Sequence, residues 1–180
     1  MRRQANHQAA LIVIFAALTA SGAFIRIPLP PVPITLQNFF VIMAGLLLGA
    51  RAGCLSQIIY LLMGLIGLPV FSGGGGIAYV MKPSFGYLLG FILAPGAVGL
   101  FMKNKAYSRG NIFIASILGM IAIYLFGVPY LALYMHYVLD KPDVIMPAIK
   151  AGLLIFLPGD LLKCIVLAAI SGRVLDTIKR

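Results

Sequence analysis

The chain has 180 residues, of which 62% are hydrophobic and only 10% are charged, and its mean hydropathy is +1.05. Soluble domains carry about a quarter charged residues, so this composition predicts a membrane protein. The net charge of +10 does not indicate nucleic-acid binding, because the basic residues lie between long apolar runs and are not interleaved with aromatic residues. We therefore expect a lipid bilayer, and no nucleic acid, around this chain.

Six apolar segments predict an all-α polytopic membrane protein with six transmembrane helices, folded as a single domain over residues 1–180. We expect the first segment to be a retained transmembrane helix and not a cleaved signal peptide, because further spans follow it. The third segment is short and covers only about 22 Å as a helix, and short segments in transporters often mark binding sites. The six segments are 9–25, 35–50, 53–67, 86–102, 111–138 and 151–172.

The basic residues predict how the chain is oriented in the bilayer. An even number of spans puts both termini on one side, and nine basic residues fall on that side against four on the other. Because positive residues are retained in the cytoplasm, we expect both termini to be cytoplasmic. The nine are Arg2, Arg3, Arg51, Lys103, Lys105, Arg109, Arg173, Lys179 and Arg180. The four are Arg26, Lys82, Lys141 and Lys150.

Two of the three connections expected outside the membrane differ from simple turns. Residues 25–35 contain four prolines, which favour an extended path. Residues 67–86, between helices three and four, are glycine-rich but still apolar, with four glycines in a row at 73–76. Irregular backbone at membrane depth is tolerated where it is buried in protein or lines a cavity. We therefore expect a pocket with a lid on the outer face, and the alternative is a flexible surface loop.

Asp160 and Lys163 are the strongest candidates for a functional site. The chain has only four acidic residues, and this one lies in the last apolar segment, three residues before a lysine. Ionised groups inside a membrane are costly and are candidates for function, and residues three apart share one face of a helix. Pro158 suits the first turn of a helix, so we expect a helix to restart there with Asp160 near its positive end. The alternative is a structural ion pair.

Other kinds of site find little support. The glycine run is not followed by Gly-Lys-Ser/Thr, so we expect no ATP hydrolysis by this chain. His7 and His136 are isolated, so we expect no metal site and no cofactor. Gln37 and Asn38 are uncharged polar groups at the outer end of helix two that can donate and accept hydrogen bonds. Tyr79 and Tyr87 could be interfacial residues or pocket walls.

Four stretches together are similar to the BioY family, the biotin-specific S components of energy-coupling factor (ECF) transporters. The resemblance covers essentially the whole chain, including its six spans. A family glycine-glycine-tyrosine pattern at the start of helix four appears here as Phe85-Gly86-Tyr87. The four stretches are VPITLQ (32–37), GLPVFSGGGG (67–76), KPSFGYLLGF (82–91) and PGDLLK (158–163).

The resemblance implies high-affinity biotin uptake from outside the cell membrane, with a transmembrane coupling protein and two ATPase subunits as partners. It implies that Asp160 and Lys163 contact the ureido ring of biotin, a match that hydrogen-bonding chemistry supports. It also implies that the AxxxA motif of helix one, here Ala16 and Ala20, docks the coupling protein. Lys82 is our candidate for the valerate carboxylate, from its charge and outside position. The remaining expected pocket residues are Phe71, Gly73, Gly74, Gly75, Gly76, Tyr79, Tyr87 and Gln37.

Two other functions stay open at this point. The chain could be an S component for another vitamin, with the same architecture and a different ligand. It could also be a membrane enzyme that uses Asp160 and Lys163 as acid and base. An enzyme would normally show more than one polar cluster near its substrate, and the sequence offers only this one.

Overall fold

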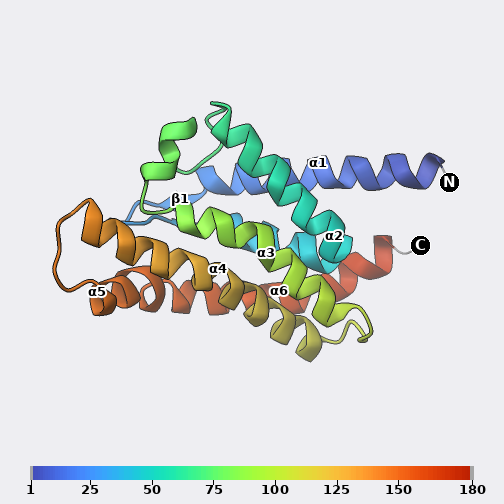
Figure 1. The fold of residues 1–180 in the computed structure, drawn as a ribbon. Helices are drawn as coiled ribbons and strands as arrows, with labels where there is room; N and C mark the ends of the chain where they lie inside the picture. The colour runs from blue at the N-terminus through green and yellow to red at the C-terminus, as the bar shows by residue number, and fades with distance from the viewer. Residues whose placement is uncertain (1, 179–180) are drawn as a thin grey trace.

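The structure is a computed structural model that describes residues 2–178, and the side chains of residues 6–170. It is a bundle of long helices, with one two-stranded antiparallel ribbon in the first outer connection. Figure 1 shows the long helices lying side by side. The elements are α1 (Arg2–Phe24), β1 (Arg26–Ile27), β2 (Ile34–Thr35), α2 (Gln37–Leu65), the 3₁₀-helix η1 (Ile77–Met81), α3 (Phe85–Met102), α4 (Arg109–Tyr137), α5 (Ile145–Ile149), the π-helical η2 (Lys150–Leu154) and α6 (Leu157–Ile178).

Within the described residues, five helical stretches are long and apolar enough to cross a membrane. Large apolar side chains remain exposed along them, among them Leu100 on α3, Leu125 on α4 and Leu162 on α6. A bundle that keeps apolar side chains on its outside as well as in its core is built to face lipid. The five stretches are 6–24, 37–65, 85–102, 109–137 and 145–170.

The difference between six expected segments and five helical stretches lies in α2, which is bent back on itself at Gly49. This residue has φ 77° and ψ −177° inside an otherwise helical run, a conformation open essentially only to glycine. The Gln37 side chain donates to the Tyr60 hydroxyl at 2.5 Å. In a straight helix these residues would be about 35 Å apart. Residues 37–48 and 50–65 are therefore two arms, and they correspond to the second and third predicted segments.

A buried polar contact joins α1 to the second arm of α2. The Gln57 side chain is fully buried and donates to the Thr19 hydroxyl at 3.2 Å. Thr19 in turn donates to the backbone of its own helix, at Phe15. Because a buried polar pair is costly to separate, this contact fixes the first helix against the bundle.

The glycine-rich connection is folded back onto the bundle. Phe71 is 2% exposed and its ring lies over Gly64, where an added Cβ would approach the ring to 1.9 Å. The Gly76 amide donates to the Gly64 carbonyl at 2.7 Å. Phe71, Ser72 and Tyr79 are buried, whereas residues 67–69 and 77–78 are exposed, so the segment is packed in part.

The last apolar segment starts earlier than predicted and is interrupted. It begins at α5 and passes through η2, whose final residue is Leu154, before α6 begins at Leu157. The predicted restart of a helix around Pro158 is confirmed, and Asp160 lies in the first turn of α6. The Tyr87 hydroxyl donates to the Gly152 carbonyl at 2.8 Å, which ties the irregular stretch to α3.

The two ends of the bundle differ. Figure 1 shows the start of α1, the end of α6, the bend of α2 and the α3–α4 connection at one end. The β1–β2 ribbon, the glycine-rich connection and the α4–α5 connection lie at the other end. We call the second end the loop end. Asp160 contacts Asn38 at the start of α2, directly after β2, and therefore lies toward this end.

Candidate ligand-binding site

Asp160 and Lys163 form a close ion pair inside the bundle. The Lys163 Nζ lies 2.8 Å from Asp160 Oδ1, and the two side chains are 13% and 7% exposed, respectively. Both come from the first turns of α6, where an i, i+3 spacing puts them on one face. A buried pair of this kind keeps its net charge near zero, which lowers the cost of placing it in a membrane protein.

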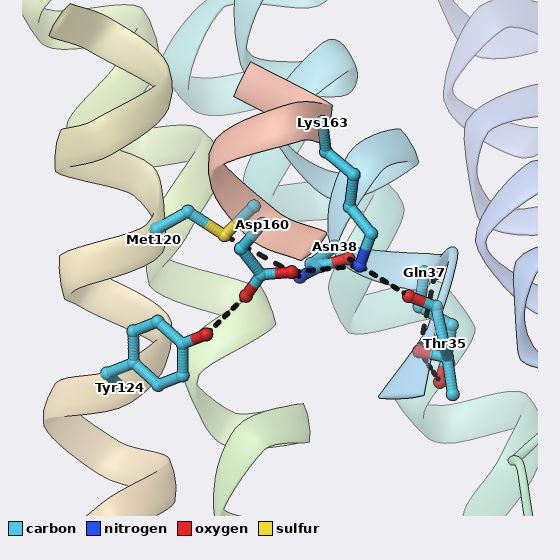
Figure 2. Close-up of polar contacts among 7 residues, drawn as sticks. All are labelled: Thr35, Gln37, Asn38, Met120, Tyr124, Asp160 and Lys163. Carbon is cyan, nitrogen blue, oxygen red and sulfur yellow. Dashed lines mark hydrogen bonds and ion pairs between the residues drawn. The ribbon is translucent and has the colours of Figure 1, made fainter. Parts of the chain in front are cut away.

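The start of α2 supplies the partners that hold this pair. Asn38 donates through Nδ2 to Asp160 Oδ1 at 2.8 Å and accepts from Lys163 Nζ at 2.9 Å through Oδ1. Lys163 Nζ also donates to the Thr35 carbonyl at 2.8 Å. The three protons of the ammonium group therefore have three acceptors. Figure 2 shows Asn38 lying between the two charged groups.

Tyr124, from the middle of α4, completes the set of donors around the carboxylate. Its hydroxyl donates to Asp160 Oδ2, the oxygen that neither Lys163 nor Asn38 reaches (Figure 2). The carboxylate thus accepts from an ammonium, an amide and a phenol, which come from three different helices. Such a network is rigid and fully paired, and removing one member leaves a buried group without its partner.

A cavity opens directly beside this network. It has a volume of about 50 Å³, which is room for a few water molecules. Its walls combine the polar groups above with apolar and aromatic side chains of five segments, and Tyr87 packs edge-on against both Tyr124 and Phe156. The lining includes Ile34, Asn38, Tyr79, Tyr87, Leu88, Phe91, Ile123, Tyr124, Phe156, Asp160 and Lys163.

A second cavity of about 370 Å³ adjoins the first and shares four residues with it. It lies under the proline-rich connection and carries two basic residues, Arg26 and Lys82. The site therefore has a buried end with a balanced charge and an outer end with positive charge. The shared residues are Pro33, Ser72, Tyr79 and Ser84.

Several residues expected from the sequence meet in these cavities. Gln37, Tyr79 and Tyr87 line the inner cavity together with Asp160 and Lys163. Tyr79 and Tyr87 therefore line a pocket in this structure, which is one of the two alternatives left open for them. The Tyr79 hydroxyl bonds to Ser72 and Ser84 at 3.1 and 3.0 Å. Gly73 and Lys82 line the outer cavity only.

The other expected pocket residues lie elsewhere. Phe71 packs behind the pocket wall, with its ring centroid 4.5 Å from that of Tyr79 and 5.5 Å from that of Tyr60. Gly74, Gly75 and Gly76 are absent from the linings of both cavities. Gly75 instead lies against the backbone of residue 68, where an added Cβ would come within 2.1 Å of the carbonyl oxygen. These residues pack behind the side chains that line the two cavities, and they do not line either cavity themselves.

The AxxxA motif of α1 also lies differently from the expectation. Ala16 and Ala20 are 0% and 8% exposed and belong to the core of the bundle. A motif that docks a partner protein needs an accessible face, and in this conformation the accessible small residues of α1 include Ala17 and Ser21. Docking through Ala16 and Ala20 would require α1 to move away from α2.

Sequence reasoning did not single out Thr35 and Tyr124, and it noted Asn38 as a hydrogen-bonding group without assigning it to the substrate site. Asn38 carried a signal, since it is polar and directly follows Gln37 at the start of a span. Thr35 contributes a backbone carbonyl, which no side-chain pattern reveals. Tyr124 lies among apolar residues in the fifth segment, where a tyrosine is unremarkable.

These features define a class: a multi-pass membrane protein with a buried, charge-balanced cavity near one end of its helix bundle. Residues 1–180 match the BioY family, and the chain belongs to this family. A probable biotin transporter BioY of Lysinibacillus sphaericus is 50% identical over 132 residues, which are 73% of this chain and 67% of that protein. The biotin transporter BioY of Thermotoga maritima is 40% identical over 89% of this chain and 90% of its own length.

A solved structure shares the fold. It is the crystal structure of the S component for biotin from an ECF-type ABC transporter, and it is 29% identical in sequence. The TM-score is 0.83, with 98% of this chain and 94% of the other chain covered. The likeness therefore extends over the whole bundle, including the elements that form the cavities.

Proposed function

We propose that this chain captures biotin for uptake, as the substrate-binding S component of an ATP-driven ECF transporter. Its relatives are named biotin transporters and its structural neighbour is an S component for biotin. The observation in this chain that carries the proposal is the network of Asp160, Lys163 and Asn38 beside a mostly apolar cavity. An enzyme is not favoured, because these relatives are transporters.

The ureido ring of biotin suits the inner end of the site. It offers two N–H donors and one carbonyl acceptor without a net charge. The Asp160 carboxylate accepts such donors, and Lys163 and the Asn38 amide donate to a carbonyl oxygen. Because all three Lys163 protons already have acceptors, the ligand replaces bonds within the protein and does not fill vacant positions.

The rest of biotin suits the aromatic walls and the outer cavity. We propose that the thioether ring packs against Tyr79, Tyr87 and other aromatic side chains of the inner cavity. The valerate chain then points to the outer cavity, where Lys82 and Arg26 supply positive charge for its carboxylate. The inner cavity, at about 50 Å³, is too small for the bicyclic ring of biotin, so we propose that binding moves the covering connections apart before they close over the ligand.

The proposed orientation places the loop end outside the cell and both termini in the cytoplasm. The bend of α2 then gives six membrane crossings, the second and third by the two arms around Gly49. The charges support this orientation, because Arg51 follows the bend of α2, while Lys103, Lys105 and Arg109 lie in or beside the α3–α4 connection. Both the bend and this connection are at the end opposite the loop end (Figure 1). The substrate site then faces outside.

Transport needs partners that supply energy. We propose a transmembrane coupling protein and two ATPase subunits, which fits an S component whose own sequence lacks a phosphate-binding loop. ATP binding and hydrolysis by the partners would reorient the loaded chain and open the site to the cytoplasm. Biotin is the transported ligand in this scheme and no cofactor takes part.

Calorimetric titration of the purified chain with a panel of vitamins tests the ligand assignment. Biotin should bind tightly and with one site per chain, while riboflavin and thiamine should give no heat beyond dilution. Desthiobiotin, which keeps the ureido ring and the carboxylate, should bind measurably. If another vitamin binds and biotin does not, the chain would be an S component for that vitamin, and the proposal would be wrong.

A further inference from the structure

The largest of the described cavities lies at the end of the bundle opposite the biotin site. It has a volume of about 1170 Å³ and lies between the bend of α2 and the α3–α4 connection. Its floor is backbone, because Gly99 of α3 packs so closely on the bend that an added Cβ would lie 2.1 Å from the Ala50 nitrogen. The proposed function assigns no ligand contact to this cavity, and it uses Arg51, Lys103 and Lys105 only as charges that set the orientation in the membrane.

The charge of this cavity has one sign. Arg51, Lys103 and Lys105 line it, and all three are exposed. Among the side chains that the structure describes, the acidic residues are Asp140, Asp143 and Asp160, and none of them lines it. A cavity with three cations and no acidic residue in its described lining attracts an anion.

The cavity also has an apolar side that continues onto the lipid-facing surface. Leu100 lines it and is 67% exposed on α3. Phe101 lies beneath the Lys105 ammonium group, which is 4.7 Å from the ring centroid. The Tyr107 hydroxyl donates to the Leu46 carbonyl at 3.3 Å and holds the connection against the first arm of α2. Cationic and apolar surfaces thus meet at the end of the membrane-spanning helices.

We propose that this cavity binds the headgroup of an anionic phospholipid. Its phosphate contacts Arg51, Lys103 and Lys105, and its acyl chains follow the exposed apolar face of α3 beside Leu100. Basic pockets at this level between transmembrane helices suit anionic headgroups. A free anion would use the cations but not the apolar side, so the combination favours a lipid.

Native mass spectrometry of the full chain in detergent tests the proposal with phosphatidylglycerol and phosphatidylcholine as probes. The wild-type chain should bind one phosphatidylglycerol about tenfold more tightly than phosphatidylcholine. The variant Arg51→Gln/Lys103→Gln/Lys105→Gln should lose this preference. A control with the same change of charge, Arg109→Gln/Lys141→Gln/Lys150→Gln, alters residues outside the cavity lining and should keep it.

Three results would overturn the proposal: equal binding of both lipids, an equal loss in the control variant, or displacement of phosphatidylglycerol by millimolar inorganic phosphate. The last would assign the cavity to a free anion. The single change Lys103→Glu, in an exposed turn, should also reduce the preference and serves if the triple variant is unstable. Biotin binding should be unchanged in all of these variants. The proposed lipid site and the proposed biotin site are therefore tested independently of each other.

Discussion

Asn38 and Asp160 are 122 positions apart in the chain, yet the Asn38 amide nitrogen lies 2.8 Å from the Asp160 carboxylate. The same amide accepts from Lys163 through its oxygen. One neutral side chain thus orients both members of the ion pair from a different helix. This contact fixes how α2 and α6 meet, and it makes Asn38 a part of the site as much as the charged residues are.

Replacing Asn38 by alanine should weaken biotin binding by about tenfold or more. The change leaves Asp160 short of one donor and Lys163 short of one acceptor, and an unsatisfied buried group costs about 1–3 kcal/mol. Calorimetric titration measures the loss. Asn111→Ala is the matched control, because Asn111 is polar, lies in α4 and bonds to the backbone of its own connection at Ala106. Equal affinities in wild type and Asn38→Ala would remove Asn38 from the site.

The positive charge of the outer cavity should select for the carboxylate of biotin. We expect wild type to bind biotin more tightly than biotin amide, and we expect Arg26→Gln/Lys82→Gln to lower this ratio by several-fold. Partly exposed charge pairs contribute about 1 kcal/mol or less each, so a larger effect is not expected. Lys141→Gln/Lys150→Gln alters the other two basic residues expected on this side and serves as the control. A ratio unchanged by the double variant would place the carboxylate elsewhere.

Gly49 should be required for stability and not for ligand contact. Its φ of 77° and ψ of −177° would cost an alanine about 1–3 kcal/mol. We expect Gly49→Ala to lower the midpoint of thermal unfolding in detergent. Gly110→Ala is the control, since an added Cβ there meets no atom within 4 Å and alanine favours a helix. An unchanged midpoint for Gly49→Ala would argue against the bend.

The two faces of α1 should respond differently to larger side chains. Ala16→Leu/Ala20→Leu adds volume inside the core, and overpacking costs about 1–3 kcal/mol, so we expect lower thermal stability and weaker biotin binding. Ala17→Leu/Ser21→Leu enlarges the exposed face and should spare both. Copurification with the coupling protein shows which pair blocks assembly. If Ala16→Leu/Ala20→Leu blocks it and spares biotin binding, the sequence-based role of the AxxxA motif holds and the packing described here does not.

The sequence was most informative where charge and apolar length carry the signal. The long apolar segments predicted the helices, and the cost of a charge in a membrane singled out Asp160 and Lys163. Pro158 predicted where α6 begins, because proline suits the first turn of a helix. These inferences need only local composition and elementary energetics.

Features that depend on tertiary contacts were harder to predict from the sequence. The glycine run suggested a ligand contact, but three of its four members line neither cavity. The spacing of Ala16 and Ala20 predicted a close helix–helix contact, and both residues are buried in the bundle. The spacing alone does not say whether that contact is with another helix of this chain or with a partner protein. Tyr124 could not be found from sequence, because its role follows from the way α4 packs beside α6.

The most direct test of the account compares biotin binding by wild type and Asp160→Asn in the same calorimetric titration. The change keeps the shape of the side chain and removes the charge that holds Lys163 and accepts the ureido donors. We predict tight binding by wild type and a loss of about 100-fold or more in the variant, since breaking a buried pair costs about 3–5 kcal/mol. Asp143→Asn, at an exposed acidic residue in the α4–α5 connection, should bind like wild type. Wild-type affinity in Asp160→Asn would contradict the central claim.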